Sequence, residues 1–443
     1  MKHRHAVHHH HIKNHFKHGL PPAVQLILLI FSSYGINFLL NSVLANHLSQ
    51  SDYGEFSLIL EISLLLSTIV LLGLDSNFIQ FGSEYKQKNT PTHAHGLFRW
   101  TEGKIKEAAL MTLAVSALMC GGLLFHNHMY NNYEPMYFSF FVVPFYAYLT
   151  LQMAYLQAYG YDMKAMAPSY VIYPLVFVTM FFGAYIYFGA MDIYKTIAVM
   201  GLSYVASGIA AYLLSNNVFK ALLFTTEPSH EHTSLWVSSS KSFWSSEIFL
   251  ICTVSYDVII LKLLFTTSLI AQTMVVFSIG GFIWTIQGVM SKHLTPFVAP
   301  GLTNDNPAAR TSLIKELKKY NRSMLACGAL MTIVVAIFGD KILAIFGQDY
   351  IHLHPTLIVY SVLATIDTYF DAASIAISLS HSQKEYKFSL VTQLILGTIG
   401  VIVLTSLYGA LGVILGYYIS TFIQAIICAV VAKRQYGVNC LVL

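Results

Sequence analysis

Apolar runs of twenty residues or more recur along the chain and limit the folds that it can adopt. Residues 24–45 read VQLILLIFSSYGINFLLNSVLA, and residues 396–432 form a longer run of the same kind. A helix of about 20 apolar residues crosses the roughly 30 Å hydrocarbon core of a bilayer. Only 10% of the 443 residues are charged, whereas soluble globular domains carry about 25%. The sequence therefore predicts a polytopic helical membrane protein.

The apolar runs predict about twelve membrane-spanning helices. Their expected ranges are 21–46, 54–80, 107–127, 136–159, 167–189, 193–216, 238–264, 268–292, 322–339, 355–380, 387–406 and 410–432. With the N-terminus inside, 22 of the 25 Lys and Arg residues fall in inward segments, and only Lys195, Lys262 and Lys341 fall outside. Because basic residues near helix ends resist translocation, this partition predicts that both termini are cytoplasmic.

Several kinds of soluble site are not expected. The five cysteines stand singly without CxxC spacing, so neither a disulfide framework nor a zinc site is predicted. The sequence has no phosphate-binding glycine loop, no GxSxG and no HExxH, so we expect no cofactor and no catalytic residue. The His-rich residues 1–19 are interpreted as a basic cytoplasmic tail near anionic lipids and not as a metal site. The net charge of +4 reflects the inward loops and does not indicate nucleic-acid binding.

Two long inward connections occupy matching places in the chain. Residues 81–106 follow the second predicted helix, residues 293–321 follow the eighth, and each ends in a short amphipathic pattern suited to the headgroup interface. Such a repeat is typical of transporters built from two halves. We predict a basic tail at 1–19, an N-terminal six-helix bundle at 20–225, a C-terminal six-helix bundle at 226–434 and a cytoplasmic tail at 435–443.

Four stretches resemble bacterial polysaccharide exporters of the O-antigen flippase type, namely residues 45–85, 256–279, 342–364 and 377–388. In the first stretch the resemblance rests on the turn residues Asp52, Tyr53 and Gly54 and on Gly73 and Leu74 at the end of an apolar helix. The resemblance implies the fold of a superfamily that also contains multidrug and toxin extrusion antiporters and peptidoglycan lipid flippases. The implied fold class is all-α, with about twelve transmembrane helices in two six-helix bundles around a central cavity.

The same resemblance implies a function. It describes a flippase that moves a polyprenyl-diphosphate-linked oligosaccharide across the bacterial cytoplasmic (inner) membrane by alternating access, for lipopolysaccharide O-antigen or other surface polysaccharide. The expected partners are the lipid-linked oligosaccharide and membrane lipids, with coupling to a monovalent cation or proton left open. Basic residues suit the diphosphate, and the candidates are Lys241 and Lys262, with Arg99 and Arg322 at the inner mouth.

Acidic residues inside the predicted spans mark candidate sites. A charge at mid-bilayer costs at least about 2.5 to 3.5 kcal/mol, so such residues tend to face a cavity or a partner. Glu61 has only apolar or small neighbours, and Glu247 follows the serine-rich stretch around Lys241, so both are predicted to line a cavity. Asp75 lies near the inner end of its helix and is expected at the membrane edge.

Two further acids sit one helical turn apart. Asp367 and Asp371 are spaced i, i+4, which puts both carboxylates on one face with Cβ atoms about 5 to 6 Å apart. Two carboxylates held together in a low dielectric resist double ionisation, which gives a physical basis for a proton or sodium site. The equal alternative is a pair of ordinary solvated acids in an aqueous vestibule.

Asp257 interrupts one of the most apolar stretches, SYDVIILKLL. Lys262 lies five residues on and about 100° further round the helix, so it is expected to reach the interface and not to neutralise Asp257. Aligning the two halves places Asp257 opposite Asn41, which predicts a water-filled cleft that the two residues share. Its role, as an ion site or a structural hydrogen bond, stays open.

Two other functions compete with the flippase. A multidrug or cation antiporter on the same fold would use the acidic residues as substrate and proton sites. A membrane-embedded glycan polymerase or glycosyltransferase belongs to another class and usually needs a large outer loop. The outer loops of this chain are short, for example HNHMYNNYEP, so we rank the enzyme below the two transporters.

Overall fold

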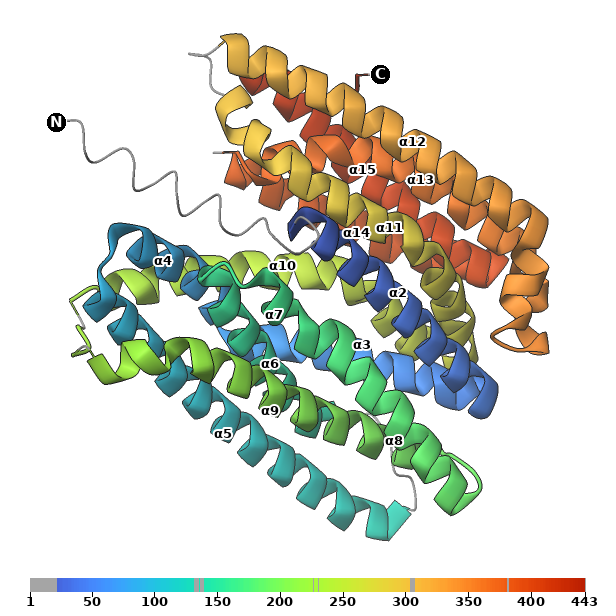
Figure 1. Ribbon diagram of the computed structural model, residues 1–443. Helices are drawn as coiled ribbons and strands as arrows, with labels where there is room; N and C mark the ends of the chain where they lie inside the picture. The colour runs from blue at the N-terminus through green and yellow to red at the C-terminus, as the bar shows by residue number, and fades with distance from the viewer. Residues whose placement is uncertain are drawn as a thin grey trace, which may run out of the picture.

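The computed structural model describes residues 22–130, 135, 139–225, 227–229, 231–302, 307–380 and 382–442, so the His-rich tail lies outside the described residues. Within these ranges the chain is helical and has no β-strand (Figure 1). The first half comprises α2 (Pro22–His47), α3 (Gln50–Leu71), α4 (Leu74–Lys88), α5 (Pro91–Tyr130), α6 (Ser139–Ala158), α7 (Asp162–Ala167), a π-helical turn (Pro168–Ile172), α8 (Tyr173–Phe188) and α9 (Ile193–Thr225). The second half comprises α10 (Thr233–Leu264), α11 (Thr267–Leu302), α12 (Pro307–Ala344), a short 3-10 helix (Gln348–Leu353), α13 (His354–Ser378), α14 (Gln383–Tyr408) and α15 (Ala410–Tyr436).

Each predicted span overlaps one of these helices. Among the described residues, eight helical stretches are long and apolar enough to cross a membrane: α2, α3, α7 with α8, α9, α11, α12, α14 and α15. The other predicted spans correspond to α5, α6, α10 and α13. The apolar runs of α10 and α13 are interrupted by acids such as Glu247 and Asp371. The prediction of an all-α polytopic membrane protein is confirmed.

The helices are arranged as two bundles (Figure 1). Helices α11 to α15 gather in the upper right of the view, α4 to α9 lie in the lower left, and α2 and α3 run between them. In the first bundle α6 packs against α3, α5 and α9, and in the second α12 packs along α13 and α14 along α15. The last pair is close because Gly400 and Gly416 face each other, and a Cβ on Gly416 would lie 2.5 Å from the Val401 nitrogen.

Helix α10 passes from one bundle to the other. Near its start the Ser240 hydroxyl donates to the Leu72 carbonyl at the end of α3 (2.6 Å). Near its end Tyr256 packs in an apolar cluster with Val401 of α14. Lys262, also near the C-terminal end of α10, pairs with Glu55 of α3 (2.9 Å), so α10 lies between the two bundles and contacts both. The predicted division at residues 225 and 226 stays a prediction, with α10 in contact with both bundles.

The prediction of one continuous helix over 54–80 is wrong, because the helix breaks at Leu72 and Gly73. Both residues have left-handed backbone, with φ of 55° and 68°, and α4 begins anew at Leu74. A Cβ on Gly73 would lie 2.6 Å from the Ser240 carbonyl oxygen and 2.6 Å from the Trp244 nitrogen. Glycine therefore serves two purposes at this point, since it accepts the left-handed turn and lets α10 approach.

We expect Gly73→Ala to lower the free energy of unfolding by about 2 kcal/mol or more, because it adds left-handed strain and a clash with α10. Thermal unfolding of the purified protein in detergent measures the effect. Gly183→Ala in α8 is the matched control, because no atom lies within 4 Å of its added Cβ. Equal melting temperatures for the two variants would contradict this explanation of the break.

The two long inward connections are helical, which corrects the prediction of loops at 81–106 and 293–321. Helix α4 runs to Lys88 and α5 begins at Pro91, whereas α11 runs to Leu302 and α12 begins at Pro307. The predicted amphipathic segments are the first turns of α5 and α12, continuous with the spans. Their apolar side packs inward, as at the fully buried Leu97.

The residues after α15 fold back onto α12. The Asn321 side-chain amide donates to the carbonyls of Cys440 (3.0 Å) and Val442 (2.8 Å), and the Arg310 guanidinium donates to the Gly437 carbonyl. Val438 and Cys440 are buried in the same apolar cluster as Leu313 and Leu317 of α12. The C-terminal segment is therefore a packed part of the second bundle.

Candidate functional site

Three cavities adjoin one another in the same half of the molecule. We call the membrane side on which α2 begins the near side, and the side on which α2 ends the far side. The α2–α11 cavity has a volume of about 440 Å³, the α13–α15 cavity about 320 Å³ and the α3–α6 cavity about 450 Å³. Trp284 lines the first two, and Leu250 and Val254 line the last two. The cavities therefore surround α10 and α11, in their middle and near-side parts.

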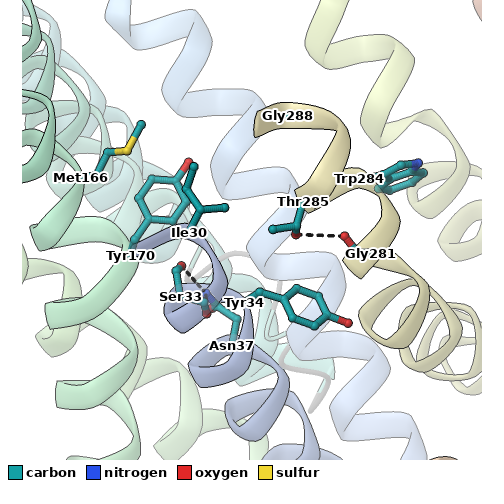
Figure 2. Close-up of a pocket in the computed structure, with 10 residues that line it drawn as sticks. All are labelled: Ile30, Ser33, Tyr34, Asn37, Met166, Tyr170, Gly281, Trp284, Thr285 and Gly288. Atoms are coloured by element: carbon teal, nitrogen blue, oxygen red, sulfur yellow. Dashed lines mark hydrogen bonds between the residues drawn. The ribbon is translucent and has the colours of Figure 1, made fainter. Parts of the chain in front are cut away.

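The α2–α11 cavity separates the near-side half of α2 from that of α11 (Figure 2). Its polar lining residues are Ser33, Tyr34, Asn37, Tyr170 and Thr285. The Tyr34 hydroxyl donates to the carbonyls of Ser278 and Ile279 (both 2.8 Å) and ties α2 to α11 at the end of the cavity toward the far side. None of the described lining residues is charged, so this cavity is neutral and amphipathic.

The α13–α15 cavity lies among α10, α11, α13, α14 and α15, and it is much more polar. Asp367 and Asp371 line it together. Asp371 accepts a hydrogen bond from the Gln287 side-chain amide of α11, and the Ser374 hydroxyl donates to the Gln424 side-chain oxygen (3.0 Å). The structure thus places the two predicted ion-site carboxylates on one cavity wall, beside neutral amides from neighbouring helices.

The α3–α6 cavity lies on the other face of α10 and holds a second acidic pair. Asp75 and Glu247 both line it. The Ser76 hydroxyl donates to Glu247 Oε1 (2.5 Å), whereas Asp75 Oδ1 is buried without a hydrogen-bond partner among the described residues. The expectation that Asp75 lies at the membrane edge stays a prediction, but Asp75 is not a surface acid, because it follows the break at Gly73 at the start of a new helix and lines this cavity.

The charged side chains that line the three cavities, among the described residues, are all acidic. Four carboxylates line them, from Asp75, Glu247, Asp367 and Asp371, and none of their described lining residues is Lys, Arg or His. Within the described residues, no group of three or more His, Cys, Asp or Glu side chains is arranged to hold a metal ion. An acidic interior of this kind favours protons, cations and hydrogen-bond donors over anions.

On the far side, α3 and α11 are in direct contact. The hydroxyls of Ser51 and Thr267 are 2.8 Å apart, and the Ser268 hydroxyl donates to the Gln50 side-chain oxygen (2.6 Å). A Cβ on Gly54 would overlap the Thr267 carbonyl. The turn predicted at Asp52, Tyr53 and Gly54 is wrong, because these residues lie in the first turns of α3, and the close approach of the two helices explains the glycine.

Two more contacts join helices on the far side. Lys262 forms an ion pair with Glu55 (2.9 Å), with both side chains largely buried. The Ile345 carbonyl at the end of α12 accepts hydrogen bonds from Ser42 (2.8 Å) and Asn46 (2.6 Å) of α2. The bundles are thus joined on the far side, and the cavities between them lie toward the near side.

Asp257 does not share a cleft with Asn41. Asp257 is only 1% exposed, and both of its carboxylate oxygens lack a hydrogen-bond partner among the described residues. Asn41 instead accepts from the Tyr53 hydroxyl (3.0 Å). The neighbour of Asp257 is Glu61 of α3, which interacts with it electrostatically and accepts from the Ser255 hydroxyl (3.1 Å). As predicted, Lys262 does not neutralise Asp257.

The predicted basic residues lie away from the cavities. Lys241, Arg99 and Arg322 are exposed, and none of them lines the three cavities. Lys241 precedes the lining residue Leu250 by nine positions, which is two and a half turns of an α-helix, so the two side chains leave α10 on opposite faces. The roles of Lys241, Arg99 and Arg322 in binding a diphosphate stay predictions.

The lining residues that the sequence did not single out are neutral. The most informative are Trp284, Gln287, Gln393, Tyr417 and Gln424. Inside an apolar run, a tryptophan or tyrosine resembles a lipid-facing residue, and only the charged residues stand out. The glutamines were the one available signal, because an amide inside a span needs a polar partner.

Comparison with solved structures places the fold. The chain is similar to the lipid II flippase MurJ in an inward closed conformation, with a TM-score of 0.66 and 13% identity over 92% of this chain and 87% of that chain. It is similar to an inward-facing multidrug resistance MATE family transporter of the MOP superfamily, with a TM-score of 0.64 and 11% identity over 93% and 98%. It is also similar to a mutant of the MATE transporter VcmN from Vibrio cholerae, with a TM-score of 0.62 and 12% identity over 95% of this chain and 98% of that chain. At such identities the likeness shows a shared fold.

A comparison of sequences gives the family. No curated protein matches the chain. The sequence profile described as "Polysaccharide biosynthesis protein" matches residues 23–288, which run from the start of α2 into the near-side half of α11 and cover more than half of the chain. The chain therefore belongs to the polysaccharide biosynthesis protein family.

Proposed function

We propose that this protein is a flippase that moves a polyprenyl-diphosphate-linked oligosaccharide from the cytoplasmic to the outer leaflet of a bacterial cytoplasmic membrane. The observation that carries the proposal is the asymmetry of the bundles, which are joined at Ser51 and Thr267 on the far side and separated by the α2–α11 cavity toward the near side. Alternating access reverses this asymmetry by rocking one bundle against the other. The near side is then the cytoplasmic side, in keeping with its many Lys and Arg residues, and both termini are cytoplasmic.

The lipid, the glycan and the diphosphate of the substrate each contact a different region of the protein or the membrane. The lipid stays in the bilayer, and the glycan occupies the cavities, whose polar walls offer hydrogen bonds. In the inward-facing state the diphosphate lies at the cytoplasmic rim, because the cavities hold carboxylates and none of their described lining residues is basic, and it crosses with the glycan when the bundles rock. The exposed Arg99, Lys241 and Arg322 attract it to that rim. Translocation by this route makes and breaks no covalent bond.

Coupling to an ion rests on Asp367 and Asp371. Both carboxylates face one cavity, and among the described residues the neutral amide of Gln287, from α11, donates a hydrogen bond to Asp371. A proton or a monovalent cation removes one negative charge from the pair when the cavity is empty of glycan. Release of that ion to one side of the membrane ties the bundle movement to an ion gradient.

A cation antiporter on the same fold is the second candidate, and the acidic walls favour it. The two functions differ in a bacterial host whose surface polysaccharide depends on this protein. We expect deletion of the gene to remove the surface glycan and to leave resistance to cationic dyes unchanged, and we expect the wild-type gene to restore glycan display. Intact glycan display together with lost dye resistance would establish the antiporter in its place.

A further inference from the structure

The α13–α15 cavity has one aromatic wall that is held rigidly. The rings of Trp284 and Tyr417 lie 6.1 Å apart, and both also pack on Phe277 at 6.0 Å. Tyr417 stacks on Tyr256 at 6.4 Å with an interplanar angle of 10°. Both wall residues keep part of their surface exposed. Aromatic rings fixed in this way present flat apolar faces, on which the C–H face of a pyranose ring packs.

The other lining residues of this cavity offer hydrogen-bonding groups. Asp367 and Asp371 supply carboxylate oxygens, and Gln287, Gln393 and Gln424 supply amides. A sugar hydroxyl donates to a carboxylate and accepts from an amide N–H at the same time, and hydrogen bonds to charged acceptors are the stronger kind. A few placed polar groups combined with an aromatic face are the usual composition of a small-molecule pocket.

The size of this cavity also excludes a bare ion as its full occupant. Its volume of about 320 Å³ reaches the range of roughly 300 to 1,000 Å³ that ligand pockets span. A single water fills only about 30 Å³, so an ion with one or two waters leaves most of the cavity unfilled.

From the aromatic wall, the hydrogen-bonding groups and the absence of basic lining residues among those described, we propose that the α13–α15 cavity is a subsite for one uncharged sugar residue of the transported glycan. This inference rests on the proposed flippase function. Trp284 and Tyr417 stack against the ring, and the carboxylates and amides bind its hydroxyls. A sugar with a carboxylate, such as a hexuronic acid, is rejected because it meets Asp367 and Asp371, with Asp75 and Glu247 in the adjoining cavity.

Flipping in proteoliposomes tests the subsite with two probes. One is a polyprenyl diphosphate linked to a neutral hexose disaccharide, and the other is the same carrier with a terminal hexuronic acid. Membrane-impermeant periodate oxidises the vicinal diols of either probe once the glycan is exposed, so one readout serves both. We expect the wild-type protein to move the neutral probe at least about tenfold faster than the acidic one, because of repulsion from the carboxylates.

Trp284→Ala separates recognition from a general defect. We expect it to lower the neutral rate by about tenfold through loss of stacking and to leave the acidic rate nearly unchanged, so that the preference collapses. Trp284→Phe keeps an aromatic face and most of the preference. Tyr408→Ala, at a 58% exposed position at the end of α14, is the matched control and keeps both rates.

Two results would overturn the subsite. One is a wild-type protein that moves both probes equally fast, a measurement that needs no variant. The other is a Trp284→Ala protein in which both rates fall by the same factor, since that describes a structural role. If the wild-type protein moves neither probe, the proposed flippase function fails, and the subsite fails with it.

Discussion

Oxidation of a Ser51→Cys, Thr267→Cys double variant is expected to reduce transport by at least about tenfold, and a reducing agent is expected to restore it. The two hydroxyls are 2.8 Å apart across the far-side contact of α3 and α11. A disulfide needs Cβ atoms about 3.5 to 4.5 Å apart, which is compatible with this contact. The bond holds the bundles together where alternating access requires them to part.

The effect of the far-side disulfide on transport is measured in a protein whose native cysteines are replaced by alanine. Surface glycan display in a dependent host, or flipping in proteoliposomes, gives the rate before and after oxidation. Ser389→Cys in a protein that keeps Cys428 is the matched control, because Ser389 Oγ and Cys428 Sγ lie 3.5 Å apart within the second bundle. A fully cross-linked far-side variant that transports at the unoxidised rate would show that α3 and α11 do not separate.

Replacing both carboxylates of the α13–α15 cavity, by Asp367→Asn with Asp371→Asn, is expected to remove the response of transport to an ion gradient. The wild-type flipping rate rises when a proton or sodium gradient is imposed, because the pair takes up the ion on one side and releases it on the other. The neutral variant binds no ion at this position. We expect its rate to fall at least about tenfold and to be the same with and without the gradient.

Proteoliposomes with imposed and dissipated gradients provide this measurement. Glu107→Gln is the matched control, since Glu107 is an exposed acid on α5 that pairs only with Lys104 in the described contacts, and its gradient response stays that of the wild type. The double variant should also discriminate less against a hexuronic acid, because the repelling charges are gone. A gradient response that survives in the double variant would assign coupling to other acids, of which Glu61 and Asp257 are next.

The charged residues allowed much of the fold to be predicted. Each Lys and Arg near a helix end reports which side of the membrane it prefers, and the apolar runs report helix length, so the spans fell in the right places. The second span failed at Gly73, because a glycine within an apolar run does not by itself show left-handed backbone. The prediction of loops at 81–106 and 293–321 is wrong because the amphipathic first turns of long helices are polar and resemble connections.

The sequence predicted most of the acidic residues of the candidate site and missed its aromatic residues. Asp367, Asp371 and Glu247 were found because a carboxylate inside a span needs a cavity or a partner. Trp284 and Tyr417 were not found, since their direction depends on how α11 and α15 pack. The predicted pairing of Asp257 with Asn41 failed because it treated the two halves as equivalent. Instead, α10 packs against α3, and Asp257 lies near Glu61 of that helix.

The most direct test of the flippase account is the rate at which a polyprenyl-diphosphate-linked oligosaccharide changes leaflet in proteoliposomes that contain only this protein. Membrane-impermeant periodate reports the glycan that has reached the exposed leaflet. If the protein is a flippase, the amount of glycan exposed to periodate rises well above that in protein-free liposomes. Formation of the far-side disulfide stops this rise, and reduction restores it. Exposure equal to that in protein-free liposomes, in a preparation that exchanges a cationic dye for protons, would contradict the flippase account.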